Sequence, residues 1–177
     1  FAAKTPYYYS TYEPFGSPGI DLLPNLEERT KDRLVTIGSG PIRIGQGIEF
    51  DYGCVHAVKA IREAGKDAII INNNPETVST DFDTSDRLYF DPLTLEYVSE
   101  ILLRERAHGI LLQFGGQTAI NLALPLEQRL PDLRLKGLDL RIMGTSCDAS
   151  DEASDRERFE AFASRSVLKM PRGATGT

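Results

Sequence analysis

The sequence predicts an α/β fold in which helices cover both faces of an open parallel sheet. The first observation is a series of short apolar segments, several of them rich in β-branched residues, whose length is typical of strands. The second is that segments with apolar residues at helical spacing separate most of these strands. Strands that alternate with helices form parallel sheets through right-handed crossover connections. The expected strands are residues 33–37, 67–71, 87–90, 109–113 and 140–144.

The N-terminal segment differs in composition from the rest of the chain. Residues 1–12 contain four tyrosines and one proline and are too few to form a core alone. Tyrosine rings are common at interfaces where the hydroxyl finds a partner. The segment is therefore either a strap that docks on a surface or a disordered terminus. Residues 13–32 have the Pro, Gly and charged composition of a linker, so we assign residues 1–32 to a Tyr-rich strap and linker and residues 33–170 to the domain.

A βαβ unit opens the expected domain. Residues 33–37 form its first strand, and a helix follows over about residues 51–64 because its apolar side chains recur at helical spacing. Gly65 supplies the stop for this helix. The second strand, residues 67–71, ends in three isoleucines.

The remaining elements repeat this alternation. Thr94 is the expected N-cap of a helix that runs to about Arg106. A turn at residues 115–117 leads into a further helix, and the Leu-rich, charged residues 128–139 stay unassigned. The last helix opens with an acidic first turn near residue 150, as the helix dipole favours.

A glycine-rich loop follows the first strand, with four glycines within residues 38–47. It lacks the dinucleotide-binding fingerprint, because Arg43 stands where the third glycine is required. It also lacks the phosphate-binding loop signature, because Gly45 is followed by Gln46 and Gly47 rather than by lysine and a hydroxyl residue. Glycine loops before a helix N-terminus approach small anions closely, so the loop is either an anion contact or a tight structural turn.

Three unusual loops are expected at one edge of the sheet. Ligands of open α/β sheets gather at the carboxyl ends of the strands. The glycine loop, the polar residues 72–86 and the Gly-rich residues 114–118 each follow a predicted strand. Glu76, just after its strand, could face Arg43 or Glu49 there. The alternative is that the polar loop only caps backbone groups and that Arg43 forms a structural ion pair.

The composition, charge and cysteine spacing of the chain argue against several classes of function. The chain has 177 residues, 41% hydrophobic, with a net charge of −6, and its charges are interspersed, so nucleic acid is an unfavoured partner. No apolar run is long enough to cross a membrane, and we expect a cytoplasmic protein. Cys54 and Cys147 are far apart in the sequence, and we expect both to be buried small side chains. The order and spacing of residues suggest no catalytic triad and no metal cluster.

Four segments together resemble the large chain of carbamoyl-phosphate synthase, in its second, carbamoyl-phosphate-forming half. They are residues 38–52, 74–90, 115–118 and 155–159, in the family's order. The resemblance implies a Rossmann-like pre-ATP-grasp domain, similar to the N-terminal domain of biotin carboxylase. It also implies that residues 171–177 begin the link to an ATP-grasp domain, whose carboxylates would bind Mg²⁺ outside this chain.

The resemblance implies a function for the longer parent enzyme. The parent is an ATP-dependent ligase that makes carbamoyl phosphate from MgATP, bicarbonate and ammonia for arginine and pyrimidine biosynthesis, and a small glutaminase subunit supplies the ammonia. By resemblance Arg156 binds the ATP phosphates, and the carbamate passage is lined by Arg43, Gly47, Glu49 and Glu76. No catalytic residue is expected within this chain, and the fragment alone is expected to be inactive. The alternative hypothesis is a freestanding nucleotide- or anion-binding regulatory module.

Overall fold

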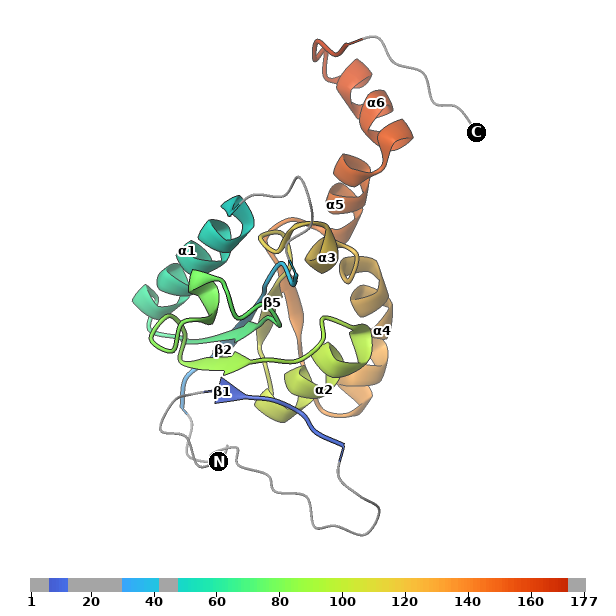
Figure 1. Cartoon of the computed structure of the whole chain (residues 1–177). Coiled ribbons are helices and arrows are strands. Elements are labelled where there is room, and N and C mark those ends of the chain that lie inside the picture. The colour runs from blue at the N-terminus through green and yellow to red at the C-terminus, as the bar shows by residue number, and fades with distance from the viewer. Residues whose placement is uncertain (1–6, 13–29, 42–47, 172–177) are drawn as a thin grey trace.

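The computed structural model describes residues 7–12, 30–41 and 48–171, and its centre is a single sheet (Figure 1). The sheet has six strands in the order β1-β4-β3-β2-β5-β6, and every neighbouring pair is parallel. The strands are β1 (Tyr7–Tyr8), β2 (Arg33–Ile37), β3 (Asp67–Ile71), β4 (Arg87–Tyr89), β5 (Gly109–Leu111) and β6 (Arg141–Met143). The helices are α1 (Glu49–Glu63), the 3₁₀ helix η2 (Val78–Thr80), α2 (Leu95–Glu105), α3 (Gly116–Ile120), α4 (Ala123–Leu135), α5 (Cys147–Ser154) and α6 (Arg156–Arg165).

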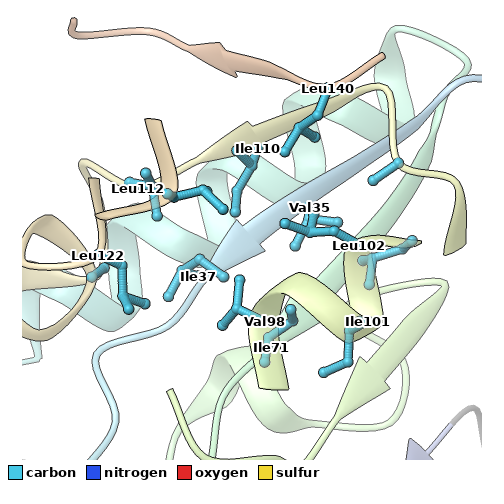
Figure 2. Packing of buried hydrophobic residues seen from close by; sticks show 14 of the residues in the cluster. Val35, Ile37, Ile71, Val98, Ile101, Leu102, Ile110, Leu112, Leu122 and Leu140 are labelled. Carbon is cyan, nitrogen blue, oxygen red and sulfur yellow. The ribbon is translucent and has the colours of Figure 1, made fainter. Parts of the chain in front are cut away.

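The central strand β2 is buried along its whole length. Its Val35 lies opposite Ile69 of β3 and Ile110 of β5. Successive side chains of a strand point to opposite faces of the sheet, so the core has two parts. One part, shown in Figure 2, packs Val35 and Ile37 against the helices that follow β4 and β5. The other part packs Leu34, with neighbouring side chains of β3 and β4, against Val58 and Ile61 of α1.

This arrangement confirms the predicted fold class, a parallel α/β sheet with helices on both faces. The helix stop at Gly65 is also confirmed, because this glycine has a φ of +73°, which favours a residue without a Cβ atom. Helix α1 begins at Glu49, two residues before the predicted start.

Two tyrosines of the N-terminal strap, which precedes the predicted domain start at Arg33, belong to the sheet. Tyr7 and Tyr8 form the edge strand β1, parallel to β4. The Tyr8 ring stacks on Tyr89 at 5.3 Å between centroids, and the Tyr7 ring meets Phe90 edge-on at 5.4 Å. A strand of two residues is too short to leave a periodic pattern in the sequence.

Two helical assignments also changed. The unassigned residues after 128 continue α4 as far as Leu135, although Pro131 lies inside this helix. Proline breaks the sequence pattern of a helix, yet Leu126 and Leu133 are buried on the core side. The predicted last helix is two helices, α5 and α6, because Asp155 adopts an extended conformation between them.

Candidate functional site

The loops after β2 and β3 meet at the carboxyl edge of the sheet. The backbone N–H of Gly38 donates to the carbonyl of Ile71 at 2.9 Å. The N–H of Gly40 donates to Asn72 Oδ1 at 3.0 Å, and Asn74 Nδ2 donates to the Gly40 carbonyl at 3.3 Å. Two asparagines of the polar loop therefore hold the described beginning of the glycine loop.

The loop after β5 packs against the same place. A Cβ atom on Gly115 would lie 2.4 Å from the carbonyl oxygen of Gly38 and 2.5 Å from that of Ile37. Gly116 has a φ of +63° and lies against the ring of Phe50 in α1. The predicted convergence of three loops is confirmed for the described residues, and glycine at position 115 lets two backbones approach closely.

The polar loop after β3 is held by its own side chains, as the capping interpretation predicted. The Thr77 hydroxyl donates to the Asn74 carbonyl at 3.1 Å. Asn72 Nδ2 lies 3.4 Å from Thr77 Oγ1 and 3.3 Å from Ser79 Oγ, and all of these side chains are buried. Buried polar groups are stable only when they are hydrogen-bonded, so the loop has one defined conformation.

One residue of this site was missed by the sequence reasoning. The Asp51 carboxylate, in the first turn of α1, accepts hydrogen bonds from the N–H groups of Val78 at 2.9 Å and Ser79 at 3.0 Å. An acidic residue in a first helical turn is expected from the helix dipole alone. Its partners are 27 and 28 positions away in the sequence, so no local signal indicated this contact.

The residues assigned to the carbamate passage have different outcomes. Arg43 and Gly47 lie outside the described residues, and so does the expected ion pair of Arg43. Glu49 is the exposed first residue of α1. Glu76 has an exposed side chain, and its backbone N–H donates to Asn74 Oδ1 at 3.0 Å. Glu49 therefore begins α1, and Glu76 lies in the turn two residues before η2, which Asp51 joins to α1.

Arg156 lies on a different part of the molecule. It is the first residue of α6, whose N-terminus is capped by Asp155, which accepts from the Arg158 N–H at 2.8 Å. The Arg158 guanidinium pairs with Asp148 at 2.6 Å and also with Asp151. The exposed Arg156 guanidinium makes no hydrogen bond or ion pair with any other described residue. Of the three arginines of α6, Arg158 and Arg165 are paired, and Arg156 has no partner among the described residues.

The arm formed by α5 and α6 leaves the body beside α3 (Figure 1). A cleft of about 340 Å³ lies between α5 and the α3–α4 region, with both polar and apolar lining residues, among them Gln117, Asn121, Gln128 and Asp151. Because α3 follows β5, the arm begins near the carboxyl edge of the sheet. The cleft does not include Arg156.

Neither thiol of the chain is a reactive group. Both cysteines are buried and unpaired, as predicted. Burial raises the pKa of Cys54 to about 12, with a smaller contribution from Asp51, and burial also raises the pKa of Cys147.

Within residues 7–12, 30–41 and 48–171, no three His, Cys, Asp or Glu side chains gather as metal ligands would. In the same ranges, no helix has the length and apolarity that a membrane span needs.

Comparison with known proteins gives a consistent result. A family model described as the carbamoyl phosphate synthase preATP-grasp domain matches residues 30–152. The carbamoyl phosphate synthase large chain of Methanosarcina acetivorans is 53% identical over 179 residues, which is 100% of this chain and 16% of the relative. The large chain of Methanothrix thermoacetophila is 54% identical and is matched by 97% of this chain and 15% of its own length.

Solved structures support the fold at low sequence identity. The biotin carboxylase domain of a single-chain bacterial carboxylase superposes with a TM-score of 0.50 at 12% identity, over 76% of this chain and 29% of that one. This likeness concerns the fold alone. The family match and the relatives show more: the chain belongs to the carbamoyl phosphate synthase large-chain family, in which it corresponds to the pre-ATP-grasp domain.

Proposed function

We propose that this chain is the pre-ATP-grasp region of the second, carbamoyl-phosphate-forming half of a synthase large chain. The chain spans about one sixth of the length of the relatives it matches, and the activity is that of the longer protein. That protein makes carbamoyl phosphate from MgATP, bicarbonate and glutamine-derived ammonia, for arginine and pyrimidine biosynthesis in the cytoplasm. The assignment to the second half is supported by residues 75–81, whose sequence resembles that half and differs from the first.

The observation that carries the proposal is the convergence of the three loops on one sheet edge. Two of these loops contain residues that the resemblance assigns to the carbamate passage. Close packing through Gly115 and the asparagine hydrogen bonds join the described parts of these loops. Arg43 and Gly47 complete the proposed passage lining, together with Glu49 and Glu76.

The proposed role of Arg156 is a contact with the phosphates of ATP. Its guanidinium is exposed and has no partner among the described residues, and a guanidinium can bind a phosphate through two charge-assisted hydrogen bonds. MgATP itself would supply the phosphoryl group and the metal charge, and we assign the Mg²⁺ ligands to the ATP-grasp domain that adjoins this region. One arginine and one helix end supply few contacts, so we propose that the fragment is inactive without that domain. The small glutaminase subunit is the second proposed partner.

The experiment is an Arg156→Met substitution in the full-length synthase. Loss of a charge-assisted contact with phosphate should raise the KM for ATP of the carbamate-phosphorylating step by about tenfold or more. Arg165→Met is the matched control, because Arg165 ends the same helix and pairs with Glu152 at 2.8 Å. An Arg156→Met enzyme with an unchanged ATP requirement would contradict the assigned role.

A further inference from the structure

The 3₁₀ helix η2 is fastened to α1 by a single carboxylate. Both oxygens of Asp51 accept backbone hydrogen bonds, from Val78 at 2.9 Å and from Ser79 at 3.0 Å. Thr77, at the N-cap position of η2, makes no side-chain cap, because its hydroxyl is bonded to Asn74. Asp51 therefore supplies the cap that η2 lacks in its own sequence. Hydrogen bonds to an ionised group are about twice as strong as neutral ones.

A second contact holds the other end of η2. The Tyr7 hydroxyl donates to the carbonyl of Thr80 at 2.9 Å, and the Tyr7 ring is fixed by its edge-on contact with Phe90. The 3₁₀ helix thus lies between α1 on one side and the edge strand β1 on the other. These elements are 73 and 27 positions away from their contacts in η2, so the position of η2 depends on tertiary structure.

Asp51 and η2 are adjacent to the two described residues of the proposed passage. Glu49 precedes Asp51 by two positions, and Glu76 precedes Val78 by two positions. The Asp51 hydrogen bonds therefore set the spacing between the segment that carries Glu49 and the segment that carries Glu76. We propose that Asp51 is a positioning residue for carbamate transfer, which keeps this part of the passage wall closed to water. This inference rests on the function proposed above.

Because carbamate is unstable in water, its escape through a loosened passage wall can be measured as ATP consumed without product. Carbamate that escapes into water decomposes, so ATP is spent in the first half of the enzyme without product from the second. A merely structural role for Asp51 would lower all activities together with the stability. A positioning role would instead raise the amount of ATP hydrolysed for each carbamoyl phosphate formed.

Asp51→Asn in the full-length synthase tests this difference. The asparagine amide nitrogen cannot accept a hydrogen bond, so one of the two contacts with η2 is lost at nearly constant side-chain volume. Loss of a charge-assisted bond should speed hydrogen exchange of the amides of Val78 and Ser79 by about tenfold. The ratio of ATP hydrolysed to carbamoyl phosphate formed should rise, while bicarbonate-dependent ATP hydrolysis is retained.

The control is Asp81→Asn, which makes the same change of charge at the residue directly after η2. Asp81 is exposed, and its side chain makes no hydrogen bond to the described residues. Both the exchange rates and the ATP ratio should stay at wild-type values in this control. Faster exchange with an unchanged ATP ratio in Asp51→Asn would overturn the proposal, as would unchanged exchange.

A second variant, Tyr7→Phe, tests the proposed positioning role if Asp51→Asn does not fold. Tyr7→Phe removes only the hydrogen bond to Thr80 and keeps the ring contact, so it should raise the ATP ratio in the same direction by a smaller factor. A wild-type ratio in Tyr7→Phe would then overturn the proposal. The proposed function is tested separately, by the wild-type full-length protein. If that protein formed no carbamoyl phosphate, the proposed function itself would be contradicted, whatever the variants do.

Discussion

Glu105 is fully buried although it ends an amphipathic helix rich in charged residues. Its Oε1 accepts hydrogen bonds from Arg87 Nε at 2.9 Å and from the Tyr89 hydroxyl at 2.5 Å. Burial and the Glu105 charge raise the pKa of Tyr89 above its ordinary value, so the phenol remains a donor. The sequence could not identify this cluster, since a glutamate at the end of a helix is normally exposed. The contacts join α2 to β4 across the core.

Cys54 gives a prediction for the pH dependence of stability. Burial raises the pKa of its thiol from 9.0 to about 12, so the unfolded thiol ionises first as the pH rises. Its contribution to stability is complete below pH 9 and is lost progressively between pH 9 and about 12. From about pH 8 to about pH 10, the destabilisation caused by Cys54→Ala should therefore shrink by about 1 kcal/mol. Urea unfolding at both pH values measures this change, and a constant difference between the two chains would show that the folded thiol titrates normally.

At the scale of elements, the strength of the local pattern decided which parts could be predicted. Strands β2 and β3 are runs of buried apolar residues, and both were predicted with their observed bounds. β1 has only two residues, and α4 continues through Pro131, so local patterns failed at both. The division between α5 and α6 depends on Asp155, one acidic residue among several, whose role as an N-cap becomes clear only from its hydrogen bond to Arg158.

The site shows the same limit. The loops were placed on one edge because parallel strands end there, which needs only the order of the elements. The Asp51 carboxylate bonds to backbone groups 27 and 28 positions away, and the pairing of Arg158 crosses the boundary between two helices. Such contacts leave no spacing pattern in a single sequence.

Because the loops approach closely at Gly115, adding one methyl group there should lower the stability of the fold. Gly115→Ala would place Cβ against two carbonyl oxygens of the β2 end, and backbone atoms cannot move aside cheaply. We expect a loss of about 3 kcal/mol in the free energy of unfolding. Gly65→Ala is the control, because its φ is +73° and nothing lies near its Cβ position, so only backbone strain of about 1 kcal/mol is expected. Equal losses in urea unfolding would contradict the packing argument.

At the scale of the whole molecule, the residues proposed for the carbamate passage and the arginine proposed for ATP lie in two different places. Glu49 and Glu76, the described residues of the proposed passage, lie near the carboxyl edge of the sheet, whereas Arg156 stands on the arm of α5 and α6 (Figure 1). The arm is tied together by Arg158 with Asp148 and Asp151, and by Arg165 with Glu152. Phe159 and Phe162 of α6 remain more than one third exposed. These features are consistent with a region that works as part of a longer chain.

The most direct test of this account is a Gly47→Phe substitution in the full-length synthase, with Leu135→Phe at an exposed position of α4 as the control. A phenylalanine side chain would fill the clearance that glycine leaves in the proposed passage. Each half should continue to hydrolyse ATP in its own partial reaction, while synthesis of carbamoyl phosphate from bicarbonate and glutamine should nearly cease. The control should match the wild type in all three assays. Normal overall synthesis by the Gly47→Phe enzyme would contradict the assignment of this sheet edge to carbamate transfer.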